Sequence, residues 1–240
     1  MQKEFVHRLG IQSGKPQEST LHIHPTLNNT NEFGTDDAEI SVISSEARKK
    51  NLDINLQPSS RRYDAAQWHS DIQFENHPAD YTSLRLTTVP ETGGDTLWAS
   101  GYEIFDRFSK PYQRFFEGLT ATYTGEGFLR LVAAGKAKLY QEPRGSPHND
   151  DKTLSTVHPV VRTNPVTGWK SIYAIGPFPR RINELSKDES DGLLAMFKQA
   201  IFEQHDLQVR FRWKNENDIG KCKRLCKIRL AFVFGRQSFS

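Results

Sequence analysis

The stretch Trp68-His69-Ser70-Asp71-Ile72-Gln73-Phe74-Glu75 contains the most informative pair of side chains in the sequence. His69 and Asp71 are two residues apart, so on extended backbone both side chains point to the same side of a strand. One imidazole and one carboxylate on one face are two of the three protein ligands of the facial triad, which holds non-haem Fe(II) and leaves coordination positions open. A tripeptide of this kind also occurs by chance, so the pair predicts a metal site that needs support from its surroundings.

Further motifs accompany this pair along the chain. LHIHP precedes it at residues 21–25, and GGDTLWAS follows it at residues 93–100. VHPVVRT and VRFRW come later, at residues 157–163 and 209–213. Jointly these motifs resemble the TauD/TfdA family of Fe(II)- and 2-oxoglutarate-dependent dioxygenases, and they are most similar to its fungal sulfonate dioxygenases. They occur in the family's order and at about its spacing, and they cover most of the chain from Leu21 to Ile219.

The hydrophobic pattern predicts a mostly β protein with helical insertions. The expected strands cover residues 81–89, the segment through Trp98 that follows a turn at Gly93-Gly94, a hairpin of 157–163 with 169–175, and 207–213. The expected helices are 102–119, divided at Pro111, then 127–141, and a third from the capping box at Ser186 to about His205. The family resemblance implies a double-stranded β-helix, or jelly roll, of the TauD type that is C-terminally incomplete.

The resemblance also implies roles for individual residues. His69 and Asp71 match the family's Fe(II) ligands. Thr96 matches the threonine that contacts the far carboxylate of the cosubstrate 2-oxoglutarate. His24 matches the histidine that reaches the sulfonate group of the substrate, although a purely structural role for it stays open. His22 is interpreted as a packing residue or a partner in a backbone hydrogen bond.

The reaction implied by the resemblance is hydroxylation of an organosulfonate beside its sulfur atom, with release of sulfite. 2-Oxoglutarate and O2 are consumed, and succinate and carbon dioxide are formed. Ala65 and Leu27 stand where taurine dioxygenase has Asn and Tyr, so two polar contacts near a taurine-like substrate are absent. A larger or more apolar sulfonate, or a sulfate ester, is therefore as plausible a small-molecule substrate as taurine.

The composition of the 240-residue chain suits one β-rich domain in the cytoplasm. Hydrophobic residues make up 36% of it and aromatic residues 11%, which is enough for a core. The mean hydropathy of −0.66, the lack of a long apolar run and a charged N-terminus predict neither a membrane span nor a signal peptide. Two cysteines do not make a disulfide framework. The sequence leaves a homo-oligomer open.

The basic character of the chain comes from its end. Residues 220–240 hold six basic residues and no acidic one, while the rest of the chain has 26 basic residues against 29 acidic. Both cysteines, Cys222 and Cys226, lie in this stretch, but without further ligands they are a poor zinc site. We therefore expect a dioxygenase domain over residues 1–219, with a polar excursion at 26–62, followed by an atypical basic tail that does not bind nucleic acid.

The family's distal iron-binding histidine and the arginine that completes the cosubstrate clamp have no match here. His158 lies in a different motif, and His205 is expected at the end of a helix. The abrupt change after Ile219 is interpreted as a retained intron, a gene-model error or a genuine tail. The alternative function is therefore that of a truncated, non-catalytic relative.

Overall fold

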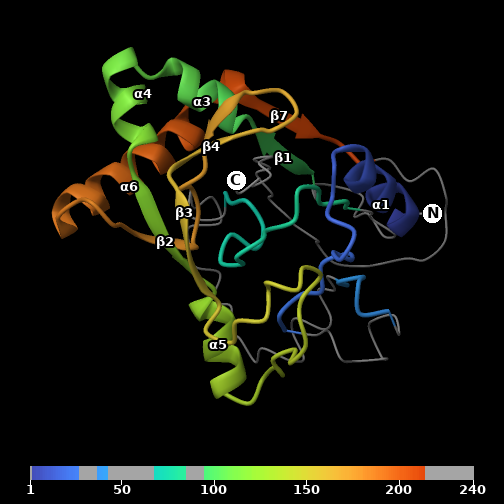
Figure 1. The fold of residues 1–240 in the computed structure, drawn as a ribbon. Helices are drawn as coiled ribbons and strands as arrows, with labels where there is room; N and C mark the ends of the chain where they lie inside the picture. Colours follow the sequence, from blue (N-terminus) through green and yellow to red (C-terminus); the bar gives the residue numbers. More distant parts are fainter. Residues whose placement is uncertain (1, 27–36, 43–67, 85–94, 214–240) are drawn as a thin grey trace.

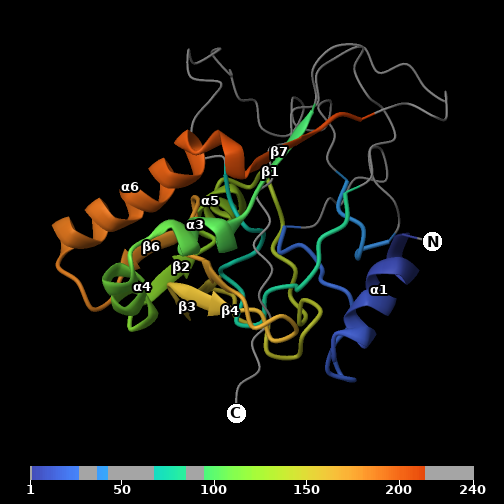
Figure 2. The ribbon, with the colours of Figure 1, turned by 90° about the horizontal axis from the view of Figure 1, so that it is seen from above.

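The computed structural model describes residues 2–26, 37–42, 68–84 and 95–213 (Figure 1). Expectations for Leu27, Ala65, the Gly93-Gly94 turn, most of the polar excursion and the basic tail fall outside these residues. Figures 1 and 2 show α6 (Lys187–Glu203) on one side of the molecule and α1 (Gln2–Gln12) on the opposite side. The segment 68–84, coloured teal, runs between them and carries the His69–Asp71 pair.

The described strands form three small antiparallel sheets. The largest has β2 (Thr120–Thr124) at its centre, between β3 (Ser155–Pro159) and β6 (Pro179–Ile182). Strand β2 alternates between half-buried and buried residues, as expected for a strand with one face on the core. Residue Ala121 of β2 pairs with His158 of β3, which places this histidine inside the protein.

The other two sheets each have two strands. In one, β1 (Thr96–Ala99) pairs with β7 (Gln208–Phe211), more than a hundred residues further along the chain. In the other, β4 (Val161–Thr163) and β5 (Lys170–Ile172) form a hairpin. The β1–β7 pairing fixes the position of Thr96, the proposed cosubstrate residue.

Helices cover one side of these sheets. The long helix α6 starts with a capping box, in which the Glu189 carboxylate accepts a hydrogen bond of 2.9 Å from the Ser186 backbone N–H. Its buried residues recur three and four positions apart and face the core, namely Leu193, Leu194, Phe197, Ala200 and Ile201. Phe197 meets Phe116 of α4 (Lys110–Glu117) with ring centroids 5.1 Å apart, and α3 (Gly101–Arg107) packs against β5. A small separate cluster joins Ile72, Phe74 and Leu154.

Most expected elements are present, while α1, β2 and β6 were not expected. The helix break lies before α4, with Pro111 in the first turn of that helix, and three further expected elements differ. The strand expected at 157–163 is divided at Val160 into β3 and β4, which belong to different sheets. The helix expected at 127–141 is shorter, because α5 (Glu126–Ala133) ends before Gly135, whose φ of +69° cannot continue a helix. Residues 81–84 are not in a strand, and the rest of the strand expected there lies outside the described residues.

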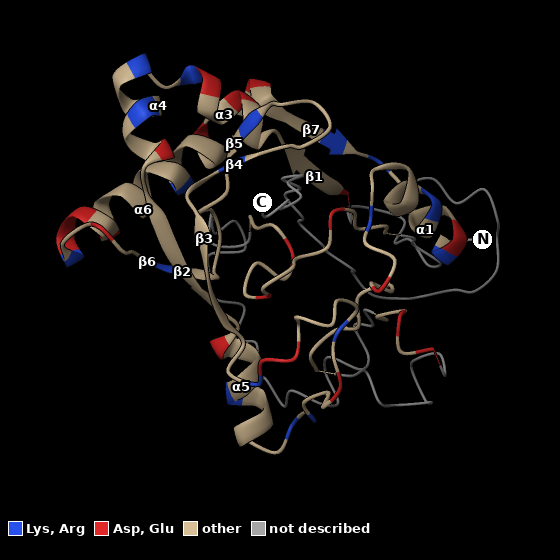
Figure 3. Cartoon of the chain, in the orientation of Figure 1, with Lys and Arg blue, Asp and Glu red and all other residues tan. Residues whose placement is uncertain are grey.

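The structure shows sheets with helices, and the jelly roll stays a prediction. Over the described ranges the strands form three small sheets and hold 28 residues, against 51 in α-helices, so this part of the chain is not mostly β as the sequence suggested. Within the same ranges, no helix is both long and apolar enough to cross a membrane. Figure 3 shows basic and acidic residues interspersed over the described elements, without a stripe of one sign.

The buried His158 predicts a loss of stability in mild acid. Its pKa is lowered to about 4, first by burial and then by the positive charge of Arg162. An unfolded histidine titrates near 6.5, so between these values the unfolded chain binds a proton that the folded chain does not. The free energy of unfolding should therefore fall as pH drops through this window, by roughly 3 kcal/mol in total for this residue.

Denaturant unfolding at a series of pH values checks this prediction. His158→Gln retains a donor for the Glu75 carbonyl, which lies 2.8 Å from the His158 Nε2 atom, but glutamine does not titrate. The free energy of unfolding of this variant should therefore decline less steeply between pH 6.5 and 4. Superimposable pH profiles for the two proteins would contradict a buried neutral His158.

Candidate active site

His69 and Asp71 converge at a turn. The Nε2 atom of His69 lies 3.2 Å from the Oδ1 atom of Asp71, and both side chains are partly exposed. The expected strand at this position is wrong, because residues 68–70 have no regular structure and a turn starts at Asp71. Both side chains nevertheless point to one site, as they would have done on a strand.

The turn depends on an unusual backbone conformation at Ile72. Its φ of +48° lies in the left-handed region, which a β-branched residue rarely adopts. Leu154 has a φ of +47° and packs with Ile72 in the same small buried cluster. Strain of this kind persists where the surrounding packing imposes it, and it is common at functional sites.

Gly176 supports the back of this turn. A Cβ atom at position 176 would lie 2.8 Å from the Cβ atom of His69 and from the carbonyl oxygen of Trp68. The φ of Gly176 is +115°, a value that other residues rarely adopt. The position of His69 therefore depends on a glycine more than a hundred residues away.

His24 lies in the same region as this pair. The pKa of His24 is lowered by burial, and a hydrogen bond to the Thr26 carbonyl and the nearby charge of Asp71 partly offset that effect. Its Nδ1 atom lies 3.0 Å from the Thr26 carbonyl oxygen, so Nε2 is the ring nitrogen positioned to meet a ligand. The His24 ring contacts Phe128, and the His69 ring contacts Phe178, each edge to face.

The geometry of His69 and Asp71 fits a metal ion. Two ligand atoms at about 2.1 Å from one ion, at right angles to each other, lie about 3 Å apart, which is close to the observed separation. One imidazole nitrogen and one carboxylate oxygen suit Fe(II). Over the residues that the structure describes, no third His, Cys, Asp or Glu joins them in a metal-binding group.

Glu75 ends the turn, and its carboxylate is held by two side chains, those of Arg144 and His22. Its carboxylate accepts hydrogen bonds from Arg144 Nε at 2.6 Å and Arg144 Nη2 at 2.8 Å. The His22 Nε2 atom lies 3.2 Å from the same carboxylate, so the hydrogen-bond partner of His22 is a side chain and not the backbone group that the sequence suggested as one possibility. Burial alone would raise the pKa of Glu75, but the hydrogen bonds from His22 and Arg144 hold it below its usual value.

Thr96 lies on another element of the chain, the strand β1. It is fully buried at the start of β1, and its Oγ1 atom accepts a hydrogen bond of 2.9 Å from the Trp213 Nε1–H. The Thr96 hydroxyl can still donate a hydrogen bond to an anion. The structure thus brings His24, His69 and Asp71 together and places Thr96 on a separate element.

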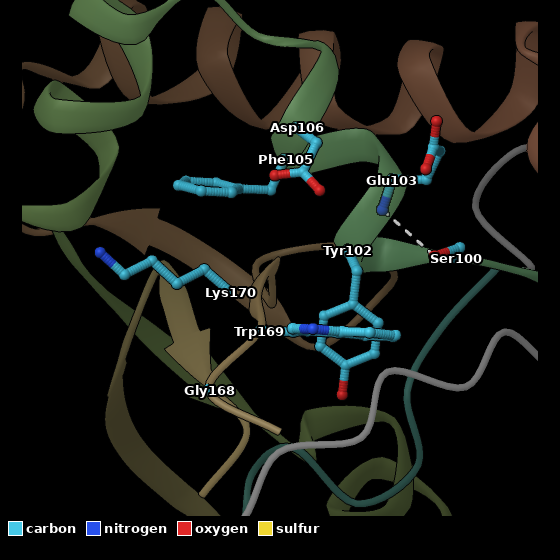
Figure 4. A pocket seen from close by; sticks show the side chains of 8 residues that line it. All are labelled: Ser100, Tyr102, Glu103, Phe105, Asp106, Gly168, Trp169 and Lys170. Carbon is cyan, nitrogen blue, oxygen red and sulfur yellow. Dashed lines mark hydrogen bonds between the residues drawn. The ribbon is translucent and has the colours of Figure 1, made fainter. Parts of the chain in front are cut away.

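A hollow of about 410 Å³ lies between α3 and the β4–β5 hairpin (Figure 4). The rings of Tyr102 and Trp169 meet there with centroids 5.7 Å apart, and Glu103, Asp106 and Lys170 supply charges. None of His24, His69, Asp71 and Thr96 lines it. This hollow is therefore not the site that the sequence predicts.

Comparison with known proteins identifies the family. The family model "Taurine catabolism dioxygenase TauD, TfdA family" matches residues 1–219. The chain therefore belongs to the TauD/TfdA family of Fe(II)- and 2-oxoglutarate-dependent dioxygenases, as its motifs predict. The residues matched include His24, His69, Asp71 and Thr96.

Individual relatives agree with the family. An "Alpha-ketoglutarate-dependent dioxygenase btcD" of Neocamarosporium betae is 47% identical, over 96% of this chain and 68% of that protein. An "Alpha-ketoglutarate-dependent sulfonate dioxygenase" of Saccharomyces cerevisiae is 33% identical, over 61% of this chain and 33% of that protein. A solved taurine dioxygenase from Burkholderia xenovorans has 25% identity and a TM-score of 0.40, over 53% of this chain and 37% of that one. The chain spans about two thirds of the length of three curated fungal dioxygenases that it matches, btcD among them.

The close approach of Gly176 to His69 predicts that a methyl group added at position 176 disturbs the fold and the metal site. Gly176→Ala should lower the free energy of unfolding by about 2 kcal/mol or more, because the new Cβ clashes with the backbone that carries His69. It should also weaken Mn(II) binding, since His69 must move. Chemical denaturation and Mn(II) titration measure the two effects.

Gly168→Ala is the matched control. Gly168 also has a positive φ, +73°, but a Cβ atom there would meet nothing within 4 Å. This variant should lose stability through backbone strain alone and retain Mn(II) affinity. Equal loss of Mn(II) affinity in the two variants would show that the contact with His69 does not determine metal binding.

Proposed function

We propose that this chain is an Fe(II)- and 2-oxoglutarate-dependent dioxygenase that hydroxylates an organosulfonate, or a related sulfate ester, and that sulfonate hydroxylation releases sulfite. The observation that supports the proposal best is the 3.2 Å approach of His69 Nε2 to Asp71 Oδ1, in a turn that several buried groups hold. The family match spans both residues and supports an activity of this class for the chain.

His69 and Asp71 would bind the metal through Nε2 and a carboxylate oxygen. When bound, Fe(II) and 2-oxoglutarate supply the oxidation of the substrate by O2. The partial exposure of both side chains leaves room on the metal-facing side for the cosubstrate and the substrate. Thr96 would orient 2-oxoglutarate by donating its hydroxyl proton to the far carboxylate.

His24 would bind the sulfonate or sulfate group of the substrate as an imidazolium: Nε2–H would donate to the anion while Nδ1–H donates to the Thr26 carbonyl, and the bound anion favours this charged form. Thr26 fixes the opposite ring nitrogen, so the orientation of Nε2 is set before a ligand arrives. Phe128 and Phe178, whose ring centroids are 6.4 Å apart, connect the rings of His24 and His69 and form an apolar wall. Such a wall excludes water and suits the carbon chain of an alkyl sulfonate. The sulfonate dioxygenase among the relatives supports this substrate class.

The comparisons favour an enzyme over a truncated, non-catalytic relative, because the proteins that this chain resembles are dioxygenases. We propose that the catalytic domain corresponds to residues 1–219 and has the jelly-roll fold of its family. The small antiparallel sheets over the described ranges are compatible with that fold. The third metal ligand is not among the described residues that surround His69 and Asp71.

Metal binding tests the first half of the proposal. The 240-residue chain should bind Mn(II), and His69→Ala or Asp71→Ala should weaken binding by about tenfold or more, because ligand number sets affinity. Titration followed by electron paramagnetic resonance gives the free Mn(II) concentration. His205→Ala, at an exposed histidine outside the site, is the control. Equal affinities in all four proteins would rule out this pair as a metal site.

Turnover tests the second half. Succinate formation from 2-oxoglutarate and Fe(II) should depend on an added sulfonate, and sulfite should appear with it. A panel of taurine, longer alkanesulfonates and alkyl sulfates distinguishes the substrate classes. His24→Gln should raise KM for the sulfonate and leave Mn(II) affinity unchanged. A chain that binds Mn(II) but forms no succinate with any compound would instead support the non-catalytic alternative.

A further inference from the structure

We propose that Glu75 is a positioning residue that fixes the substrate-side segment Leu21–Thr26 against the turn carrying His69 and Asp71. Arg144 and His22 are its partners in this role. The inference rests on the proposed function, because it assigns Glu75 to the placement of His24 relative to the metal-binding pair. Neither the sequence motifs nor the family match gives Glu75 or Arg144 a role.

The carboxylate of Glu75 is buried and accepts several hydrogen bonds. The side chains of Glu75 and Arg144 are each only 1% exposed, and their two hydrogen bonds form a bidentate pair. Arg144 Nη2 also donates to the Asp151 carbonyl at 2.8 Å, which restricts the guanidinium further. A planar, bidentate contact of this kind fixes orientation as well as distance.

Glu75 is hydrogen-bonded within the turn that carries His69 and Asp71. The Glu75 backbone N–H donates to the Ile72 carbonyl at 3.0 Å, directly after Asp71. The Glu75 carbonyl lies 2.8 Å from His158 Nε2, and Gln73 Nε2 donates to the Tyr173 carbonyl at 2.5 Å. These contacts hold the backbone of Glu75 in the turn, so the turn sets the position from which its carboxylate reaches its partners.

Glu75 and the chain next to Arg144 also contact the segment that carries His24. His22 contacts the Glu75 carboxylate directly and lies two residues before His24. Gly145, next to Arg144, approaches this segment so closely that a Cβ atom there would lie 2.8 Å from the Cα atom of His22. The Thr20 N–H donates to the Gly145 carbonyl at 2.8 Å, and the Tyr140 N–H donates to the Pro25 carbonyl at 2.8 Å. Residues 139–145 thus run beside residues 20–26.

A buried ion pair adds little net stability compared with apolar residues of the same shape. The effect of this pair on the geometry of the site is therefore a better test of its role than its effect on stability. The Glu75 carboxylate contacts His22 of the histidine segment directly, and the Glu75 backbone belongs to the turn, so one residue joins the two. Supporting groups of this kind set the precision of a site, and a displacement of about 1 Å is enough to impair one.

Paramagnetic broadening by Mn(II) reports the distance between the bound ion and the His24 ring. The full chain is labelled with ¹⁵N-histidine, and the ring signals of His24 and His69 are assigned with the His24→Gln and His69→Ala variants. Mn(II) alone is the probe. The wild-type chain should show broadening at both rings. In Glu75→Gln the broadening at His69 should persist, while that at His24 should fall about twofold, because a shift of about 1 Å is expected and broadening declines steeply with distance.

Three further variants make the test specific. Arg144→Lys and His22→Gln each remove part of the contact and keep the Glu75 carboxylate, so they test the role if Glu75→Gln does not fold. Gln113→Met is the matched control, because Gln113 is buried and bonds to the Phe105 carbonyl at 2.9 Å, at the end of α3. It should lose stability but retain the wild-type ratio of broadening at His24 and His69.

The outcomes separate this inference from the proposed function. No broadening at His69 in the wild-type chain would refute the metal site, and this inference with it. Broadening at His69 with an unchanged signal ratio in Glu75→Gln, Arg144→Lys and His22→Gln would refute the positioning role alone. A ratio that falls equally in Gln113→Met would also refute it, because general destabilisation would then explain the change.

Discussion

The ion pair between Glu75 and Arg144 is the interaction on which the rest of the site depends. Removal of either partner would leave a buried, uncompensated charge, at a cost of about 3–5 kcal/mol. Because its hydrogen bonds keep the pKa of Glu75 below the usual value, the carboxylate is charged at neutral pH and loses its stabilising effect only as pH falls into the acid range. Around this pair are assembled the turn with its left-handed Ile72, the supporting Gly176 and the segment that carries His24.

Much of the local structure could be predicted from the sequence, because its signals are local. The capping box at Ser186 marks the start of α6, and the Asn164–Gly168 turn marks the β4–β5 hairpin. Long-range pairing is harder to see. The division of residues 157–163 between two sheets depends on β2 and β5, and nothing in the VHPVVRT motif itself signals a break at Val160.

The candidate site shows the same limit. His69 and Asp71 follow from a short motif and its surroundings, and the structure brings them together. Their backbone could not be predicted, because alternation suggests a strand and a β-branched residue argues against the left-handed turn that forms. Glu75, Arg144 and Gly176 have no local signature as supporting residues. Their importance comes from contacts between segments at least 53 residues apart.

The central claim is that His69 and Asp71 share one metal ion. Diffraction at the manganese absorption edge, from crystals of this chain soaked in Mn(II), tests it most directly. The account predicts an anomalous peak within bonding distance of both His69 Nε2 and Asp71 Oδ1, on the side that His24 faces. Soaked crystals that show no peak there, with the two side chains still joined by a direct hydrogen bond, would contradict it.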